Sequence, residues 1–167
     1  MEQLINLILS EVNMEGNELR EGRPVELLKS FWNVQKNMMQ LIQKTAVNHG
    51  LSVPQYVILV TIAPYGEMLQ KTVVEKTFLP KSTLSQAVEG LVSKGFIERH
   101  HVEGNRREVE LLLSEEGKRF LKELHVQKSG IHDVFQQAAD VLTEKEYEGI
   151  LRTHNEISAL LERKIVE

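Results

Sequence analysis

The spacing of apolar residues changes twice along this chain of 167 residues, and that change restricts the folds open to it. Over about residues 25–94 and again over about 114–161, apolar residues recur at intervals of three and four, which is typical of helices. Between them, Val109, Leu111 and Leu113 occupy alternate positions, which is typical of a β-strand. With a preceding segment at 96–102 and a turn at 103–106, they predict a hairpin within a mainly α fold.

Helical patterns cover the chain before this hairpin. The stretch 25–47 carries two rows of apolar residues and predicts a long helix that is buried on a wide face. Ser52 and Gln55 form a capping-box pattern, which predicts the start of a second helix over about 52–63.

A helix-turn-helix is predicted next. Residues 70–77 form a weaker helical stretch, and residues 82–94 form a helix with one apolar face. The break between them, at 78–80, contains Pro80 and is short, as the turn of a helix-turn-helix requires. The hairpin follows directly, which is the order of elements in a winged helix-turn-helix.

Two more helices are predicted after the hairpin. Ser114 begins a helix expected to continue to about Val141, and Thr143 with Glu146 forms a second capping box. The final helix is expected to bury Tyr147, Ile150, Leu151, Ile157 and Leu161. A short amphipathic helix is also expected at 4–12.

Composition excludes several kinds of chemistry. The chain contains no cysteine, so it has no disulfide, no thiolate nucleophile and no zinc finger. Its net charge of −4 points away from nucleic acid. However, residues 70–107 contain seven Lys and Arg against four Glu, so the acidity belongs mainly to the other helices. The surface formed by residues 70–107, which is expected to contact DNA, is mildly basic. We therefore expect weak non-specific binding to DNA.

The chain contains no pattern of a membrane protein. The first residues are apolar but open with Glu2 and lack the basic start of a signal peptide. No later stretch approaches the roughly 20 apolar residues that a membrane-spanning helix needs. We therefore expect a cytoplasmic protein with no membrane partner.

Five motifs in the same order and with the same gaps resemble the multiple antibiotic resistance regulator (MarR) family, over about residues 27–163. They are Leu51-Ser-Val-Pro-Gln55, Leu79-Pro-Lys-Ser-Thr-Leu-Ser-Gln86, Leu91-Val-Ser-Lys-Gly-Phe-Ile-Glu-Arg99, Asn105-Arg-Arg107 and Leu113-Ser-Glu-Glu-Gly117. The resemblance implies a homodimeric transcription factor with a winged helix-turn-helix DNA-binding lobe and long N- and C-terminal dimerisation helices.

The sequence patterns and the resemblance together predict a division of the chain. The resemblance implies a dimerisation helix at 24–50, the DNA-binding lobe at 51–117 with its wing at about 96–113, and the C-terminal dimerisation helices at 118–167. Residues 1–23, which the resemblance does not cover, are expected to form an extra helix and a connector. An independent reason to expect a partner chain is the breadth of the apolar faces on the terminal helices. One small winged-helix core cannot cover them, and large exposed apolar faces are usually buried by association.

The helix over 82–94 is expected to enter the major groove of double-stranded DNA. Polar side chains at its start point away from the apolar face and can contact base edges or phosphates, and Gln86 can bind adenine through two hydrogen bonds. An alternative is that Ser82 or Thr83 only caps the helix. The expected DNA-contacting residues are Lys81, Ser82, Thr83, Ser85 and Gln86.

The wing is expected to bring Asn105, Arg106 and Arg107 to DNA. The resemblance implies a minor-groove or phosphate contact from an arginine at the tip, and guanidinium groups suit both contacts. A solvated turn or a packing salt bridge is the alternative, chiefly for Arg107. Asn105 departs from the family pattern, in which an aspartate precedes the arginines and orients one of them.

The resemblance places Trp32, Tyr56 and Phe135 near an effector pocket, although aromatic residues more often belong to a core. The absence of cysteine excludes the peroxide-sensing thiol of some relatives. His125 and His132 are expected on one helix, two turns apart and too distant to share a metal. No metal, cofactor or catalytic constellation is predicted, so we expect a protein that is not an enzyme.

We therefore expect a regulator that occludes a promoter and acts as a repressor rather than an activator. A small-molecule effector that binds between the lobes can alter their separation and hence the fit to DNA. The alternative is a winged-helix protein-interaction module that has lost DNA binding. The acidic net charge, Asn105 and the extra N-terminal helix favour that alternative.

Overall fold

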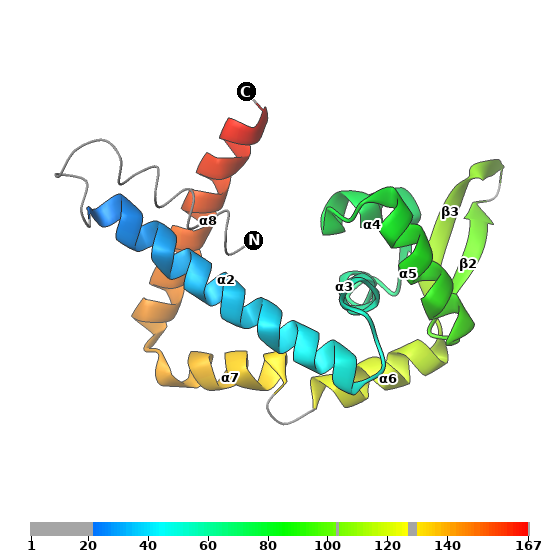
Figure 1. The fold of residues 1–167 in the computed structure, drawn as a ribbon, viewed down its shortest axis with the longest axis horizontal. Coiled ribbons are helices and arrows are strands. Elements are labelled where there is room, and N and C mark those ends of the chain that lie inside the picture. Colours follow the sequence, from blue (N-terminus) through cyan, green and yellow to red (C-terminus); the bar gives the residue numbers. More distant parts are fainter. Residues whose placement is uncertain (1–21, 103, 127–129, 167) are drawn as a thin grey trace. The chain divides into compact units, whose positions relative to one another are not determined.

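A computed structural model describes residues 22–102, 104–126 and 130–166, with the backbone alone at 106, 107 and 166 (Figure 1). The helix expected at 4–12 lies outside the described residues. Contacts divide the chain into two units, one ending at Gln40 and the other beginning at Leu41, so the boundary falls within one helix.

The first unit contains most of α2 (Arg23–Asn48), the long helix predicted from the two apolar rows. Pro24 lies in its first turn, where a residue without an N–H costs no hydrogen bond. The expectation that this helix is buried on a wide face is wrong for the single chain. Large apolar side chains of this unit remain exposed, namely Leu27, Leu28, Val34 and Met39.

The second unit begins with the end of α2 and with α3 (Val53–Ile62), whose start the capping box predicted. The Ser52 N–H donates to the Gln55 side-chain oxygen at 3.0 Å, and the Gln55 N–H donates to the Ser52 hydroxyl at 3.4 Å. The predicted helix-turn-helix follows as α4 (Gln70–Thr77) and α5 (Lys81–Ser93). Both helices lie within one residue of their expected bounds at each end.

The predicted hairpin is formed by β2 (Ile97–Val102) and β3 (Asn105–Leu113). The strands are antiparallel, with Ile97 opposite Leu113, and Gly104 takes the turn with φ 78°. A third strand, β1 (Glu67–Leu69), pairs with the other edge of β3, so the sheet order is β1-β3-β2. Three residues are too few for a periodic pattern, which is why β1 was not predicted.

One core holds α3, α4, α5 and the sheet together, and we call this part of the chain, residues 51–117, the winged-helix lobe. The largest of the fully buried side chains come from all three helices and from the sheet. Burial of apolar area is therefore the main stabilising contribution to the lobe. These residues are Ile58, Leu59, Ile62, Val73, Leu84, Val88, Leu91, Ile97 and Leu111.

The expected single helix from Ser114 to Val141 is wrong. Instead, α6 (Glu115–His125) and α7 (Ile131–Val141) are separate, and Figure 1 shows the break between them. Gly130, which precedes α7, has extended backbone at φ −76° and ψ 172°. Helical apolar spacing continues on both sides of the break, so periodicity alone did not detect it.

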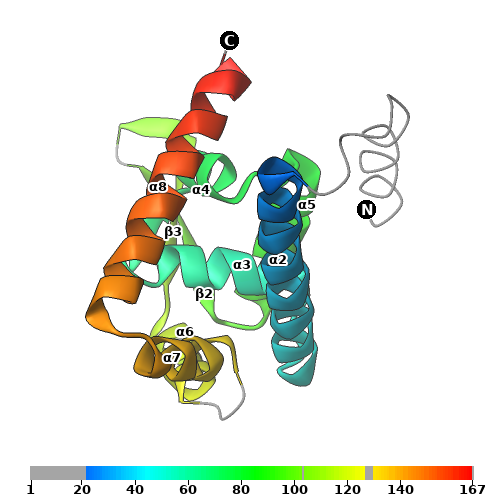
Figure 2. The same ribbon diagram turned by 90° about the vertical axis from the view of Figure 1, so that its left-hand side faces the viewer.

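The last helix, α8 (Glu144–Val166), starts where the second capping box predicted. The Thr143 N–H donates to the Glu146 carboxylate at 2.9 Å. Leu142 and Thr143 separate α8 from α7, and Figure 2 shows the turn between the two helices. The expected burial is wrong: Ile157 is only half-buried, and the other four apolar residues named for this helix are exposed. None of the helices among the described residues is long and apolar enough to cross a membrane.

Candidate nucleic-acid interface

Helix α5 has a buried face and an exposed polar face. Leu84, Ala87, Val88 and Leu91 are buried in the lobe, and their spacing of three and four keeps them on one side of the helix. The expected DNA contacts Lys81, Ser82, Ser85 and Gln86 are all exposed, whereas Thr83 is half-buried. The lobe therefore presents four of the five residues outward.

The start of α5 excludes the capping alternative. Pro80 is the N-cap residue and makes no side-chain cap hydrogen bond, and the helix begins at Lys81. Ser82 and Thr83 therefore lie inside the first turn, where neither acts as the N-cap. Lys81 and Ser82 stand at the end of α5 that a recognition helix presents to base edges.

The wing residues follow the hairpin turn directly. Asn105 is exposed and lies opposite Val102, and a register irregularity occurs between His101 and Val102. Because β3 begins at Asn105, Arg106 and Arg107 lie in the first turn-proximal positions of that strand and not in the turn itself. The register passes from the pair Val102–Asn105 to the pair His101–Val109, so both arginines lie in the irregular part of β3 next to the turn.

An ion pair joins the wing to α5. The Arg99 guanidinium on β2 donates to the Glu89 carboxylate on α5 at 3.0 Å. The Glu89 side chain is well exposed, so the pair adds little stability by itself. The pair joins β2 to the helix that carries the expected base contacts.

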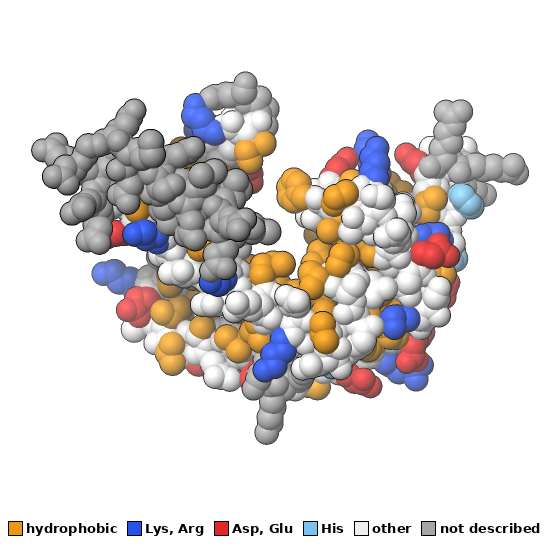
Figure 3. All heavy atoms as spheres, viewed as in Figure 1, with side chains coloured by type: hydrophobic (Ala, Val, Ile, Leu, Met, Phe, Trp, Pro, Cys, Tyr) orange, Lys and Arg blue, Asp and Glu red, His pale blue; other side chains and the backbone are white. Residues whose placement is uncertain are grey.

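Carboxylates neutralise part of the positive charge in this region. Glu89 pairs with Arg99, and the Glu75 carboxylate lies 4.0 Å from the Lys71 ammonium. The Lys76 ammonium lies near an aromatic ring instead, 5.6 Å from the centre of Tyr65. In the view of Figure 3, acidic, basic and apolar side chains are interspersed over the surface of the lobe. The lobe therefore offers only a modest attraction to phosphates in general.

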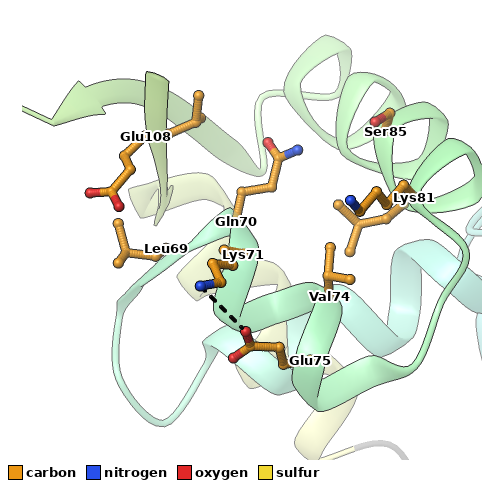
Figure 4. A pocket seen from close by; sticks show the side chains of 10 residues that line it. Leu69, Gln70, Lys71, Val74, Glu75, Lys81, Ser85 and Glu108 are labelled. Carbon is orange, nitrogen blue, oxygen red and sulfur yellow. Dashed lines mark ion pairs between the residues drawn. The ribbon is translucent and has the colours of Figure 1, made fainter. Parts of the chain in front are cut away.

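Two hollows flank α5. The larger, of about 610 Å³, lies between α4, α5 and β3, and the smaller, of about 370 Å³, lies between α5 and the hairpin. Gln70 and Ser85 line both, and Figure 4 shows Gln70 between the strand that carries Glu108 and helix α5. Sequence reasoning did not single out Gln70, which is the first residue of α4.

Ser114 and Gly117 join the start of the wing to α6. Both residues belong to one of the five motifs that resemble the MarR family. The Ser114 hydroxyl accepts from the Gly117 N–H at 2.9 Å and donates to the Gly95 carbonyl at 2.5 Å. A Cβ on Gly117 would collide with the Phe96 carbonyl oxygen and would lie 2.9 Å from the Leu113 side chain. Close approach of two backbones is therefore the reason for glycine here.

The expectation that His125 and His132 stand apart on one helix is wrong. They lie on α6 and α7, and their ring centres are 4.0 Å apart. Partial burial lowers the pKa of His132, and the neighbouring His125 lowers it further. Among the described residues, no group of three or more His, Cys, Asp or Glu is placed to hold a metal ion.

This histidine pair predicts a pH-dependent stability. The unfolded chain binds a proton at His132 near pH 6.5, whereas the folded chain binds it only at lower pH. The stability that His132 contributes is therefore fully present above about pH 6.5 and is lost as pH falls from that value through the lower pKa of the folded chain. We expect His132→Gln to reduce the fall in Tm between about pH 7 and pH 5, and His125→Gln to reduce it less. Identical pH responses in all three proteins would contradict this.

The three expected effector residues have different surroundings. Tyr56 is buried in the lobe core, and this burial raises the pKa of its hydroxyl. Phe135 on α7 is 51% exposed, and Trp32 is a half-buried residue of the first unit. For Tyr56 the core role is thus confirmed, and an effector role for the three remains a prediction.

Comparisons with solved structures show the same fold at low sequence identity. AbfR of Staphylococcus epidermidis, in a structure of the reduced protein bound to DNA, is 19% identical, with a TM-score of 0.61 and coverage of 85% of this chain and 94% of AbfR. AbsC, a MarR family transcriptional regulator from Streptomyces coelicolor, is 21% identical, with a TM-score of 0.66 and coverage of 81% and 92%. BpsR of Bordetella bronchiseptica is 19% identical, with a TM-score of 0.64 and coverage of 80% and 98%.

The sequence itself matches the family model described as MarR family over residues 49–108. Comparison with curated proteins finds no match. The fold and this match together define the class, a winged-helix DNA-binding transcriptional regulator. Within that class, residues 49–108 match the MarR family, and four of the five motifs that resemble the family lie in this range. The matched residues span α3, the helix-turn-helix and most of the hairpin.

Proposed function

We propose that this protein is a transcriptional repressor that binds a pseudo-palindromic operator as a homodimer. The observation that carries the proposal is the pairing of two features in one lobe. The outward face of α5 presents Lys81, Ser82, Ser85 and Gln86, and the hairpin beside it brings Arg106 and Arg107 to its outer end. A helix for the major groove next to a ribbon with arginines is a combination suited to duplex DNA.

In this proposal, α5 supplies the sequence preference and the wing supplies much of the affinity. Gln86 and the serines read base edges, since their short polar groups can donate and accept hydrogen bonds. Thr83, which is half-buried, contributes less than the other four residues of the helix. Arg106 and Arg107 bind phosphates or the minor groove, and exposed Asn105 replaces the charged partner of one arginine with an amide.

Homodimer formation is supported by the apolar residues that the chain leaves exposed outside the lobe. They lie on the three helices assigned to dimerisation, in segments 24–50 and 118–167. Scattered apolar residues are common on surfaces, but rows of them along long helices are typical of association surfaces. The exposed residues are Leu27, Leu28, Val34, Met39 and Val47 on α2, Val134, Phe135 and Val141 on α7, and Tyr147, Ile150, Leu151, Leu160, Leu161 and Ile165 on α8.

Relatives of the same fold support both the DNA partner and regulation by a small molecule. AbfR has a structure bound to DNA, and the DNA binding of BpsR is regulated by 6-hydroxynicotinic acid. A molecule that favours one separation of the two lobes in a dimer shifts the population toward or away from the DNA-binding form. We therefore propose that an effector, of a class still to be identified, modulates this protein.

Selection of bound duplexes from random DNA tests the proposal. We expect a pseudo-palindrome with half-sites about 34–36 Å apart, which is one helical turn. Binding should weaken steeply with salt, because Lys and Arg release counterions from phosphates. A single asymmetric half-site bound by a monomer would contradict the dimer, and the absence of salt-sensitive duplex binding at micromolar protein would favour the interaction-module alternative.

A further inference from the structure

Phe78 lies in the turn between α4 and α5. Both its backbone conformation and its exposure to solvent are unfavourable for a phenylalanine in the isolated lobe. Its backbone is left-handed, with φ 53° and ψ 19°, and it is the only described residue other than glycine with positive φ. Its side chain is 90% exposed, the highest exposure among the large apolar residues of the described chain. An exposed apolar residue alone is ordinary, but an aromatic residue in the left-handed region is a genuine outlier.

The turn around Phe78 is held firmly, so its conformation is not incidental. The Phe78 N–H donates to the Val74 carbonyl at 3.0 Å, and the Thr77 hydroxyl donates to the Val73 carbonyl at 2.7 Å. Leu79, the next residue, packs against the lobe core. With Leu79 turned inward and the backbone closed by these bonds, the Phe78 ring is directed into solvent.

Glycine or asparagine would suit this position better than phenylalanine. Both tolerate the left-handed conformation that ends a helix, and neither exposes an aromatic ring to water. Phe78 therefore costs stability through its backbone and gains little from burial. Backbone strain of this kind persists where the residue serves function, and an observed outlier is a reason to look for a contact outside the chain.

The neighbours of Phe78 indicate which partner makes that contact. Phe78 comes three residues before Lys81, the first residue of α5, and Lys81 and Ser82 are exposed at the same end of the helix. The N-terminal residues of a recognition helix meet the base edges. The turn that immediately precedes them therefore stands at the rim of the same groove.

We propose that the Phe78 ring contacts DNA directly and packs against apolar groups at the rim of the major groove. Those groups are the C5-methyl of thymine, with which phenylalanine packs in other complexes, or the sugar of the adjoining nucleotide. The inference rests on the proposed function, since it names a further contact of the same interface. It adds an apolar contact to an interface otherwise composed of polar and basic side chains.

The first test compares Phe78→Gly, Phe78→Met and the unaltered protein on the selected operator duplex. Phe78→Gly is expected to raise Tm, because it relieves the backbone, and to weaken operator binding by about tenfold, because the ring contact is lost. Phe78→Met retains an apolar side chain and is expected to bind more tightly than Phe78→Gly. A Tm increase with unchanged operator affinity in Phe78→Gly would overturn the proposal.

The second test replaces operator thymines singly with deoxyuridine, which removes only the C5-methyl. If the ring packs on that methyl, one replacement weakens the unaltered protein and leaves Phe78→Gly unaffected. If the ring packs on the sugar, no replacement distinguishes the two proteins, while Phe78→Gly still binds more weakly to every duplex. Failure of the unaltered protein to bind any duplex would overturn the proposed function and this inference together, whereas tight binding with no effect of Phe78→Gly would overturn the inference alone.

Discussion

Replacing Gly117 with alanine is expected to destabilise the protein by about 1–3 kcal/mol, as overpacking of a filled site does. The added Cβ meets the Phe96 carbonyl oxygen, which belongs to the backbone and cannot rotate away as a side chain can. Relief requires α6 to move from the start of the wing, where Ser114 joins the two through the Gly95 carbonyl. For a chain of this size, Tm is expected to fall by roughly 2–4 °C for each kcal/mol.

Gly149→Ala is the matched control, because Gly149 also lies in a helix but has no atom within 4 Å of an added Cβ in this chain. Alanine in a helix interior is better than glycine by about 0.5–1 kcal/mol, so this variant should be slightly more stable. The two substitutions add the same methyl group and should act in opposite directions. Equal Tm values for both variants would show that the contact with Phe96 is not restrictive.

Replacing Arg106 with alanine is expected to weaken DNA binding across many sequences. If each protomer loses one phosphate contact, the slope of log affinity against log salt becomes less steep by about 0.9 per contact, or roughly 2 for the dimer. At moderate salt the expected loss of affinity is about tenfold or more. Titration of one operator and one unrelated duplex at several salt concentrations measures both quantities.

Gln86→Ala provides the contrast, because Gln86 is exposed on α5 and carries no charge. Its loss is expected to relax the preference at one base pair in each half-site and to leave the salt slope unchanged. If Arg106→Ala retains the affinity and the salt slope of the unaltered protein, Arg106 does not contact DNA. In that case the alternative of a solvated turn at the wing would hold.

Local sequence motifs predicted where helices begin, because a capping box is satisfied within four consecutive residues. Ser52 with Gln55 and Thr143 with Glu146 make the predicted hydrogen bonds, whatever the rest of the chain does. Apolar spacing likewise predicted the buried face of α5, since Leu84, Val88 and Leu91 all lie in the core. The same spacing did not predict the break between α6 and α7, because helical periodicity runs through it.

Burial is where sequence reasoning was wrong, because periodicity identifies an apolar face but not the surface that covers it. The apolar residues of α8 have the spacing of a buried face, yet most are exposed in the single chain. The contact of His125 with His132 also depends on the break between α6 and α7, which a continuous helix would not contain. Strand β1 depends on pairing with a segment more than 40 residues away, which no local pattern records.

By itself, the sequence determined the order of helices and hairpin, the helix starts and the MarR family motifs, because those depend on short-range hydrogen bonds and on residue identity. Only the tertiary structure decided which polar side chains face outward beside the wing, and why Gly117 must lack a Cβ. It also decided that Phe78 holds a strained conformation with its ring in solvent. The physical reason is that exposure and close backbone approach depend on atoms brought together from distant parts of the chain.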